Sequence, residues 1–428
     1  MVLARPCDPP ITACANGKVT IWLARIASIR WRLAFLCLLL AVAALAGLII
    51  WLEQAAERDP FQASAIADAP FPSLTYAVQA FLWWDENHAG KSLDLVRLMS
   101  FSHVKQVFAW RDLEPIRGEW HWSAAERILD AAERRELKLV ARLGGVPAWA
   151  RPESHGTVKD GPPLDLARWA GYCEKVAQRF AGRVAAYQIW NEPNLSREWG
   201  GDKPEPAAYV ELLAACSKAI RRVDPQAILI SAGLAPTGTN DATAMPDDIY
   251  FDHLYRNSFQ TYINVVGVHA PGFVPPEIGP DDPQAAQRWF TFRRVEDLRK
   301  IMLRHGDAAR QMAILEFGYT TDTTNPDYTW FSVSEDEQAE FILRAYDYAI
   351  ANWRNWVGLM TLIYLPDPAW QPDDEEYWWS VIEPATGAAR RAYIDVANMR
   401  KVCGEFIIPA REPDSPAALG VEPAPVCP

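Results

Sequence analysis

Two glutamates, Glu192 and Glu316, each follow an apolar run of the kind that forms a buried strand. Residues 184–189 precede the first glutamate, and residues 312–315 precede the second. Proline cannot donate to a strand ladder, so Pro193 should end the first strand at Glu192 and hold that glutamate extended. Either glutamate alone fits a solvated turn or a structural salt bridge. Two such carboxyl groups at one end of a sheet predict glycosidic bond hydrolysis, in which one donates a proton and the other attacks the sugar.

Further side chains that could bind a sugar follow the same predicted strands. Asn191 can hydrogen-bond a sugar hydroxyl, and His269 could contact the nucleophile or a hydroxyl, or could be a structural histidine. Aromatic side chains at strand ends could stack on sugar rings or serve as packing, and they are Trp110, Trp149, Trp190, Tyr364 and Trp379. The chain has 19 tryptophans, which is many for 428 residues and fits a carbohydrate cleft.

These residues need a scaffold that brings the ends of several strands together. The predicted strands are 74–81, 104–110, 138–143, 184–190, 227–232, 263–269, 311–316 and 357–364, and the predicted helices are 91–99, 123–137, 165–180, 206–223, 249–262, 284–305, 335–352 and 388–401. The strands are mostly apolar throughout, as in a sheet covered on both faces. Eight strand–helix pairs favour an α/β fold, the (β/α)8 TIM barrel, whose active site lies at the carboxyl ends of the strands. The absence of a glycine-rich phosphate loop after the first strand weakens the alternative of an open dinucleotide-binding sheet.

An apolar segment precedes the barrel. Residues 33–52 carry no charge and are long enough to span a membrane as a helix. The arginines before this segment and the acidic residues after it predict a cytoplasmic N-terminus. A cleaved signal peptide with its site at 44–46 is the alternative, but the apolar run continues beyond that site. We therefore expect a single N-terminal transmembrane helix, with the barrel on the extracytoplasmic side of the cell membrane.

The chain thus divides into five predicted parts. They are a basic cytoplasmic segment (1–32), the transmembrane helix (33–52), a linker (53–73), the catalytic barrel (74–403) and a proline-rich C-terminal tail (404–428). The net charge of -12 argues against nucleic acid as a partner, because nucleic-acid binders are basic. No cysteine spacing typical of a zinc site is present, and we predict no metal and no cofactor.

Four of the seven cysteines follow the apolar segment, where an oxidising compartment would allow disulfides. Cys403 and Cys427 flank the proline-rich tail and could close it. Cys173 and Cys216 fall on two successive predicted helices. Sequence alone leaves the pairing open.

Three segments carry a resemblance to a known group of enzymes. They are residues 108–122, which include Glu-Pro and Gly-Glu-Trp-His-Trp, residues 190–194 (Trp-Asn-Glu-Pro-Asn) and residues 314–318 (Ile-Leu-Glu-Phe-Gly). With them, the chain from about 74 to 400 resembles the clan A glycoside hydrolases, which are retaining enzymes built on the (β/α)8 barrel. It is most similar to family 39 and to membrane-anchored glycosidases associated with bacterial exopolysaccharides.

The resemblance implies roles for individual residues. Glu192 resembles the acid/base and Glu316 the nucleophile, Asn191 resembles the residue that contacts the 2-hydroxyl, and His269 resembles the sixth-strand histidine of such sites. The chain departs from the pattern at two places. Many relatives carry an arginine on the second strand, where this sequence has Lys105, and a common tyrosine after the sixth strand is replaced by Ala-Pro.

We therefore expect a membrane-anchored, extracytoplasmic, retaining glycoside hydrolase. Its expected partners are a polysaccharide or oligosaccharide substrate of the cell envelope, the membrane, and polysaccharide biosynthesis machinery. One alternative is a catalytically inactive glycan-binding or scaffold protein of a polysaccharide biosynthesis or export system. A second alternative is a transglycosylase, which uses the same residues but transfers the sugar to another sugar.

Overall fold

The computed structural model describes residues 31–32, 34–48, 61, 66–156, 158, 160–412, 415 and 424–427. The chain divides into two compact units, Met1–Gln62 and Ala63–Pro428. In the first unit, residues 34–48 are helical and their side chains are exposed. Within the described part of the chain, no helix is both long enough and apolar enough to cross a membrane. The predicted span 33–52 lies partly outside the described residues, as does most of the predicted linker 53–73.

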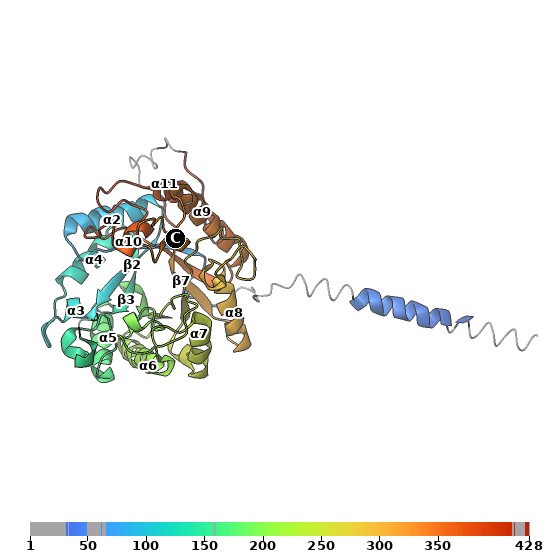
Figure 1. Ribbon diagram of the computed structural model, residues 1–428, viewed down its shortest axis with the longest axis horizontal. Helices are drawn as coiled ribbons and strands as arrows, with labels where there is room; N and C mark the ends of the chain where they lie inside the picture. The colour runs from blue at the N-terminus through green and yellow to red at the C-terminus, as the bar shows by residue number, and fades with distance from the viewer. Residues whose placement is uncertain are drawn as a thin grey trace, which may run out of the picture. The chain divides into compact units, whose positions relative to one another are not determined.

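The second unit contains a closed barrel of eight parallel strands in sequence order (Figure 1). The strands are β1 (Thr75–Gln79), β2 (His103–Ala109), β3 (Lys138–Gly144), β4 (Val184–Ile189), β5 (Ile228–Ser231), β6 (Val265–His269), β7 (Gln311–Phe317) and β8 (Val357–Leu362). The barrel closes where β1 pairs with β8, which sets Tyr76 beside Met360. The prediction of a (β/α)8 barrel is therefore confirmed.

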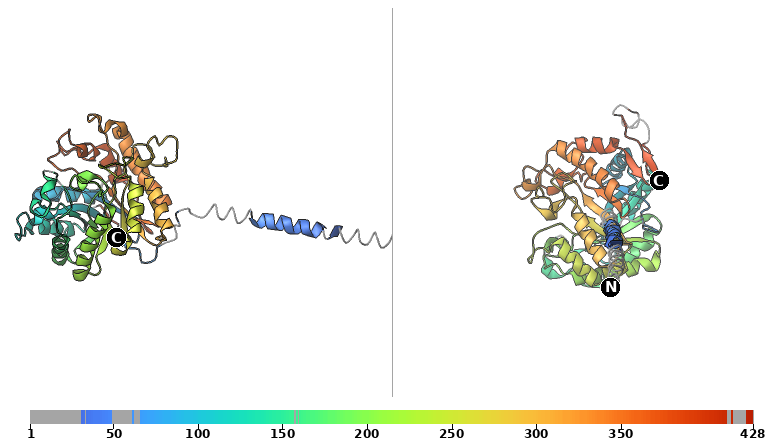
Figure 2. Two further views of the ribbon diagram at one scale, coloured as in Figure 1. Left: turned by 60° about the horizontal axis from the view of Figure 1, so that its bottom comes forward. Right: turned by 90° about the vertical axis from the view of Figure 1, so that its right-hand side faces the viewer.

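Helices surround the strands as a ring (Figures 1 and 2). The longer helices are α2 (Glu86–Leu98), α4 (Ser123–Glu133), α5 (Leu166–Phe180), α6 (Pro206–Val223), α7 (Asp247–Arg256), α8 (Arg294–Arg304), α9 (Glu335–Asn352) and α11 (Arg391–Asn398). Short helices in the loops are α3 (Trp110–Leu113), α10 (Glu375–Trp379), η1 (Ala148–Ala150), η2 (Glu153–His155), η3 (Ser196–Glu198), η4 (Phe259–Tyr262), η5 (Arg288–Phe290) and η6 (Thr329–Phe331).

Local sequence explains where several of these helices begin. Ser334 precedes α9 and forms a capping box with Glu337, which satisfies backbone N–H groups at the helix start. Asp165 accepts from the backbone of the first turn of α5. The helix predicted over 284–305 begins only at Arg294, because its first part forms a loop whose aromatic side chains pack against Trp330. Tertiary packing there overrides helix propensity.

Small and branched apolar side chains fill the barrel below its carboxyl ends. They are Ala77, Val140, Ala186, Ile230, Val265, Ala313, Leu315 and Leu359. Phe71, from the segment before β1, joins this layer. The backbone N–H of Phe71 donates to Oε1 of Gln311 at 3.0 Å, and Nε2 of Gln311 donates back to the Phe71 carbonyl at 2.8 Å. This reciprocal bonding seals the end at which the strands begin.

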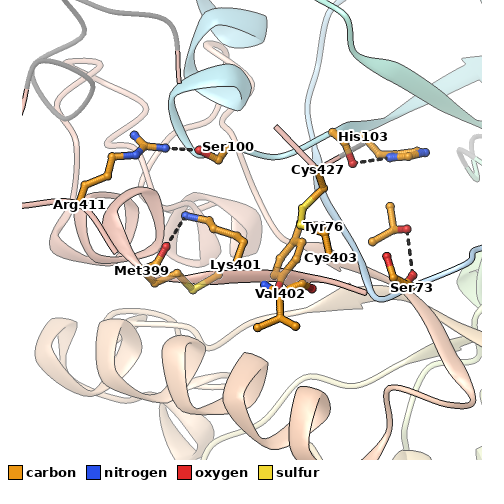
Figure 3. Close-up of a disulfide and its surroundings, with 12 residues drawn as sticks. Ser73, Tyr76, Ser100, His103, Met399, Lys401, Val402, Cys403, Arg411 and Cys427 are labelled. Carbon is orange, nitrogen blue, oxygen red and sulfur yellow. Dashed lines mark hydrogen bonds between the residues drawn. A yellow bond between two sulfur atoms is a disulfide. The ribbon is translucent and has the colours of Figure 1, made fainter. Parts of the chain in front are cut away.

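A second group of contacts ties the C-terminal segment to the same end of the barrel (Figure 3). The hairpin of β9 (Lys401–Cys403) and β10 (Phe406–Ile408) lies beside β1, where the Tyr76 hydroxyl contacts Val402. A disulfide joins Cys403 to Cys427. The fully buried Lys401 donates from Nζ to the carbonyls of Val396, Ala397 and Met399 at 2.6, 2.8 and 3.0 Å, which satisfies carbonyls at the end of α11.

A second disulfide joins Cys173 of α5 to Cys216 of α6, the two helices on either side of β4. Both cysteines are fully buried. All four cysteines beyond the apolar segment are therefore paired, and the two pairs match the two associations that the sequence suggested. Cys37 is free, whereas Cys7 and Cys14 lie outside the described residues.

Candidate active site

Three predicted site residues meet at the carboxyl end of the barrel. One carboxylate oxygen of Glu192, one of Glu316 and a ring nitrogen of His269 all lie within 4.8 Å of one another. Nδ1 of His269 lies 2.9 Å from Oε1 of Glu192 and 3.6 Å from Oε2 of Glu316. The two glutamate side chains are 13% and 12% exposed, so both are mostly buried but still reach solvent at the barrel mouth. The fold thus brings together two carboxyl groups that are 124 positions apart by their residue numbers, 192 and 316.

The backbone around Glu192 differs from the extended conformation expected before Pro193. β4 ends at Ile189, and both Trp190 (φ 74°) and Glu192 (φ 39°) adopt left-handed conformations. Non-glycine residues in this region carry strain and persist only where the surroundings hold them. The Glu192 N–H donates to the carbonyl of Gly233 at 3.0 Å, a contact from the loop after β5 that proline chemistry could not predict.

Gly233 also makes room for His269. A Cβ atom at Gly233 would lie 2.1 Å from Cδ2 and 2.3 Å from Nε2 of the His269 ring. The His269 ring is 2% exposed, and its Nε2 has no hydrogen-bond partner among the described residues. Because the ring is confined in this way, its Nδ1 is directed at the two carboxylates.

Glu316 stands among positive charges. Nζ of Lys105, on β2, lies 3.0 Å from Oε1 of Glu316, and Nη1 of Arg142, on β3, lies 3.9 Å from the same oxygen. Burial opposes ionisation, but His269, Lys105 and Arg142 together lower the pKa of Glu316 to about 2. This glutamate is therefore a carboxylate at neutral pH.

Glu192 has different neighbours. Burial opposes its ionisation, but the hydrogen bond and charge of His269, with the charge of Arg197, lower the pKa of Glu192 below its ordinary value. Nη2 of Arg197, on η3, lies 3.5 Å from Oε2 of Glu192. On the same short helix, burial and the charge of Glu192 raise the pKa of Glu198 to about 8. Burial and the charge of Glu192 thus favour the protonated form of Glu198.

The two asparagines of the Trp-Asn-Glu-Pro-Asn segment do different things. Asn191 is largely buried, and its Oδ1 accepts from Nε2 of Gln188 at 3.2 Å. Asn194 is fully buried and bonds the backbone of Ala235 and Met245, which ties the loop after β4 to the loop after β5. The predicted role of Asn191 toward a sugar stays a prediction, whereas Asn194 is structural.

Two of the predicted stacking residues are part of the core. Trp110 is 1% exposed, stacks on Tyr172 and donates from Nε1 to Glu114 at 2.7 Å. Trp190 is 2% exposed and packs between Trp169 and Trp199. Neither ring has a face open to a sugar, so the prediction that Trp110 and Trp190 line the sugar site is wrong. The tip of a strand places a residue near the mouth, but its rotamer decides whether it faces inward.

The other three predicted aromatic residues differ in their burial. Trp149 is half-buried, with its edge against Trp110 and its Nε1 donating to the Glu114 carbonyl at 3.1 Å. Trp379 is 5% exposed and belongs to a buried cluster with Phe331, against which Phe273, Phe290, Tyr328 and the half-buried Tyr364 pack. Burial, with the charge of Glu316, raises the pKa of the Tyr364 hydroxyl well above its usual range.

Glu192, His269 and Glu316 also have the donor atoms of a metal site. Their surroundings favour a different role, because the Lys105 ammonium already bonds Oε1 of Glu316 and a second cation, Arg142, stands beside it. A divalent ion at that point would be repelled by both.

Sequence reasoning missed the cations and the second acid of this site. Lys105 was noted only as a departure from a pattern, and Arg142, Arg197 and Glu198 were not identified. A signal was present for Lys105 and Arg142, since each is a charged residue in the interior of a mostly buried strand. Arg197 and Glu198 lie in a loop, whose path the sequence does not specify.

Comparison with known proteins supports the resemblance to glycoside hydrolases. The family model described as β-galactosidase, glycoside hydrolase family 42, matches residues 80–176. No curated protein matches the chain in sequence. The matched segment includes β2, β3 and most of α5, but neither glutamate of the candidate site.

Solved structures share the barrel. A family 39 glycoside hydrolase from Bacteroides cellulosilyticus WH2 matches with a TM-score of 0.56 and 19% identity over 78% of this chain, and this chain covers 64% of that protein. A family 5 glycoside hydrolase from Streptomyces cattleya, in complex with Manβ1-4GlcNAc, matches with a TM-score of 0.55 and 18% identity, over 76% of this chain and 79% of that one. A glucosidase from Croceicoccus marinus matches with a TM-score of 0.55 and 14% identity, over 76% and 67%. These solved glycoside hydrolases share the barrel fold of this chain, and the family-model match over residues 80–176 agrees with the resemblance inferred from the sequence.

Proposed function

We propose that the protein is a retaining glycoside hydrolase that acts on a polysaccharide or oligosaccharide through Glu192 and Glu316. The observation that carries the proposal is the approach of the two carboxyl groups, whose oxygens lie within 4.8 Å at the barrel mouth. Carboxyl groups about 5–5.5 Å apart suit a covalent glycosyl-enzyme, whereas inverting enzymes need about 6.5–9.5 Å to admit a water molecule.

The surroundings of the two glutamates suit different roles in the first step. The carboxylate of Glu316, ionised by its cationic neighbours, attacks the anomeric carbon while the glycosidic carbon–oxygen bond breaks. The leaving oxygen takes a proton from Glu192. In the free site the lowered pKa of Glu192 favours its carboxylate, so the proton that it donates must first pass to it from His269 across their 2.9 Å hydrogen bond when a substrate binds.

In the second step Glu192 acts as a base. Its carboxylate removes a proton from water, whose oxygen attacks the anomeric carbon and releases Glu316. Configuration is retained because the carbon is inverted twice. If a sugar hydroxyl replaces water, the same residues perform transglycosylation.

The experiment that tests the proposal compares two alanine variants on a panel of 4-nitrophenyl glycosides. An activated aryl leaving group needs little protonation, so the Glu192→Ala enzyme should form its covalent intermediate and then stall. Added azide needs no base and should restore turnover with retained configuration. In the Glu316→Ala enzyme azide should give the inverted product. Glu174→Ala, at a partly exposed glutamate of α5 that pairs with Arg222 outside the candidate site, serves as the control.

Each outcome of this test assigns a function. Exchanged azide products would reverse the roles of the two glutamates. Unchanged activity in both variants would show that the pair is not catalytic, and no turnover by the wild-type chain on any glycan of a broad panel would favour a glycan-binding scaffold. Products longer than the substrate would favour transglycosylation.

We propose in addition that the chain is anchored through residues 33–52, with an extracytoplasmic barrel. The uncharged run and the preceding arginines support the anchor, and two disulfides support an oxidising compartment for the barrel. Protease added to intact cells should degrade the barrel but spare residues 1–32. Complete protection of the barrel would contradict this topology.

A further inference from the structure

A lysine is buried directly beneath the candidate nucleophile. Lys105 lies on β2, in register with Gln79 of β1 and Val140 of β3. Its side chain is fully buried, although it carries an ammonium group. The register partner Val140 belongs to the apolar layer inside the barrel, so Lys105 also points inward. A charged group in such a place needs partners that offset the loss of water.

Those partners come from a single strand. Nζ of Lys105 donates to the Leu315 carbonyl at 3.0 Å and to Oε1 of Glu316 at 3.0 Å. One ammonium thus joins the backbone of β7 to the carboxylate that the same strand carries. A carboxylate held at one oxygen by a fixed donor keeps its other oxygen in a defined direction, which is a condition for in-line attack.

We propose that Lys105 is a positioning residue whose proton holds Glu316 in place and thereby sets the alkaline limit of activity. The proposal rests on the function assigned above to Glu316. When the ammonium loses its proton, Glu316 loses its nearest positive charge and its strongest hydrogen bond. The carboxylate remains ionised but is no longer fixed.

The other groups around Glu316 do not replace Lys105. From β3, Nη1 of Arg142 lies 3.9 Å away, beyond hydrogen-bond distance. From β6, His269 lies 3.6 Å from the other oxygen. Glu192 follows β4 and Tyr364 follows β8, and they bring only negative or neutral groups, while Gln79 on β1 is neutral.

The titration of Lys105 falls within an accessible range. Burial lowers the pKa of Lys105 to about 8, against the opposing charge of Glu316. The chain contains a natural comparison in Lys401, which is equally buried at the other end of the barrel, where burial lowers its pKa to about 6. Lys401 contacts only carbonyls, so its titration should have no effect on Glu316.

The first experiment needs no substrate. In the full-length chain labelled with 13C at lysine Cε and glutamate Cδ, we expect a lysine signal that titrates near pH 8 and disappears in the Lys105→Arg variant. The Cδ signal of Glu316, assigned by its loss in Glu316→Gln, should shift at the same pH in the wild type but not in Lys105→Arg. Lys401→Arg is the matched control and should leave both observations unchanged.

Two results of this experiment would overturn the proposal. One is a Lys105 signal that titrates only above pH 9.5, near the value of a free lysine. The other is a Glu316 signal that does not respond between pH 7 and pH 10, or that responds equally in Lys105→Arg.

The second experiment measures kcat/KM from pH 6 to pH 10 on the best aryl glycoside of the panel. Wild-type kcat/KM should fall on the order of tenfold above pH 8. Arginine stays protonated, so Lys105→Arg should move the fall upward by at least one pH unit. Lys105→Met should lower kcat/KM at pH 7 and show no such fall. An unshifted alkaline limb in Lys105→Arg overturns the proposal. If no glycoside is cleaved, the proposed function fails, and the titration still decides whether Lys105 holds Glu316.

Discussion

The two ends of the barrel each contain a fully buried lysine, and they use it differently. At the carboxyl end, Lys105 contacts a carboxylate that the proposed mechanism requires to react. At the opposite end, Lys401 contacts three carbonyls of a helix terminus and has no acidic partner at hydrogen-bond distance among the described residues. Burial lowers the pKa of both lysines. The comparison shows that burial alone does not mark a functional cation, because the partner decides what the charge does.

The two ends of the barrel also differ in backbone conformation and in hydrogen bonding. The mouth holds Trp190 and Glu192 in left-handed conformations, and it leaves Nε2 of His269 without a described partner. The closed end holds Phe71 with both of its backbone groups bonded to Gln311. Left-handed non-glycine residues also occur at Ser100 and Glu136, which follow α2 and α4, so this conformation is not confined to the mouth.

The largest effect is expected from Glu316→Gln at the mouth. The loss of the nucleophile should lower kcat/KM by a factor on the order of 10⁴–10⁶. Folding should persist, because glutamine keeps the size of the side chain. Steady-state rates with the most reactive aryl glycoside, together with far-UV circular dichroism, check this. A Glu316→Gln variant with more than a tenth of wild-type activity would show that Glu316 is not the nucleophile, and the proposed contrast between the two barrel ends would then fail.

At the closed end, Phe71→Ala should reduce stability without touching the chemistry. Replacement of a buried phenylalanine by alanine costs about 3–5 kcal/mol. Denaturant unfolding should show this loss, while kcat/KM per folded molecule stays within about twofold of wild type. Phe406→Ala, on the exposed face of β10, is the matched control. A loss of activity that exceeds the loss of folded protein would show that the two ends are coupled.

Reduction of the Cys173–Cys216 disulfide should have the next largest effect. The bridge closes a loop of 43 residues in sequence separation, for which chain entropy predicts a stabilisation of about 2–4 kcal/mol. Because the bridge links the helices on either side of β4, its loss should lower stability more than activity. The paired Cys173→Ala, Cys216→Ala variant, compared with wild type by thermal unfolding, checks this. An unchanged unfolding temperature would contradict it.

The smallest effect is a pH dependence of stability. The folded-state pKa of Lys105, lowered by burial to about 8, is below the unfolded value of about 10.5. Between these values the unfolded chain binds more protons, so stability should rise with pH, by up to about 1.4 kcal/mol per pH unit. The difference in unfolding free energy between wild type and Lys105→Arg should therefore grow from pH 8 to pH 10. If the difference in unfolding free energy did not change between pH 8 and pH 10, the pKa of Lys105 in the folded protein would be near its ordinary value.

The parts predicted from the sequence depend on local patterns. The alternation of apolar runs and amphipathic stretches suffices for a barrel, and the barrel rule then places Glu192, His269 and Glu316 at one end. The exposure of Trp110 and Trp190 could not be predicted, because it depends on which neighbours surround each ring. The conformation of Glu192 depends on Gly233, a contact between two loops that no local pattern encodes.

The partners of the buried charged residues could not be predicted from the sequence either. Lys105 and Arg142 stand out in the sequence as charges within buried strands, yet nothing local indicates that both face Glu316. Their meeting depends on strand register, which the closed barrel fixes and the sequence pattern leaves open.

The pairing of β1 with β8 has a consequence for the order in which the protein acquires its parts. Tyr76 pairs with Met360, so the barrel cannot close until nearly all of its strands have been synthesised. Contacts this distant along the chain make folding slow. A nascent chain of 300 residues would already carry Glu192 and Lys105 but would lack β7 and β8. On the ribosome, the candidate active site is therefore among the last features of the molecule to exist.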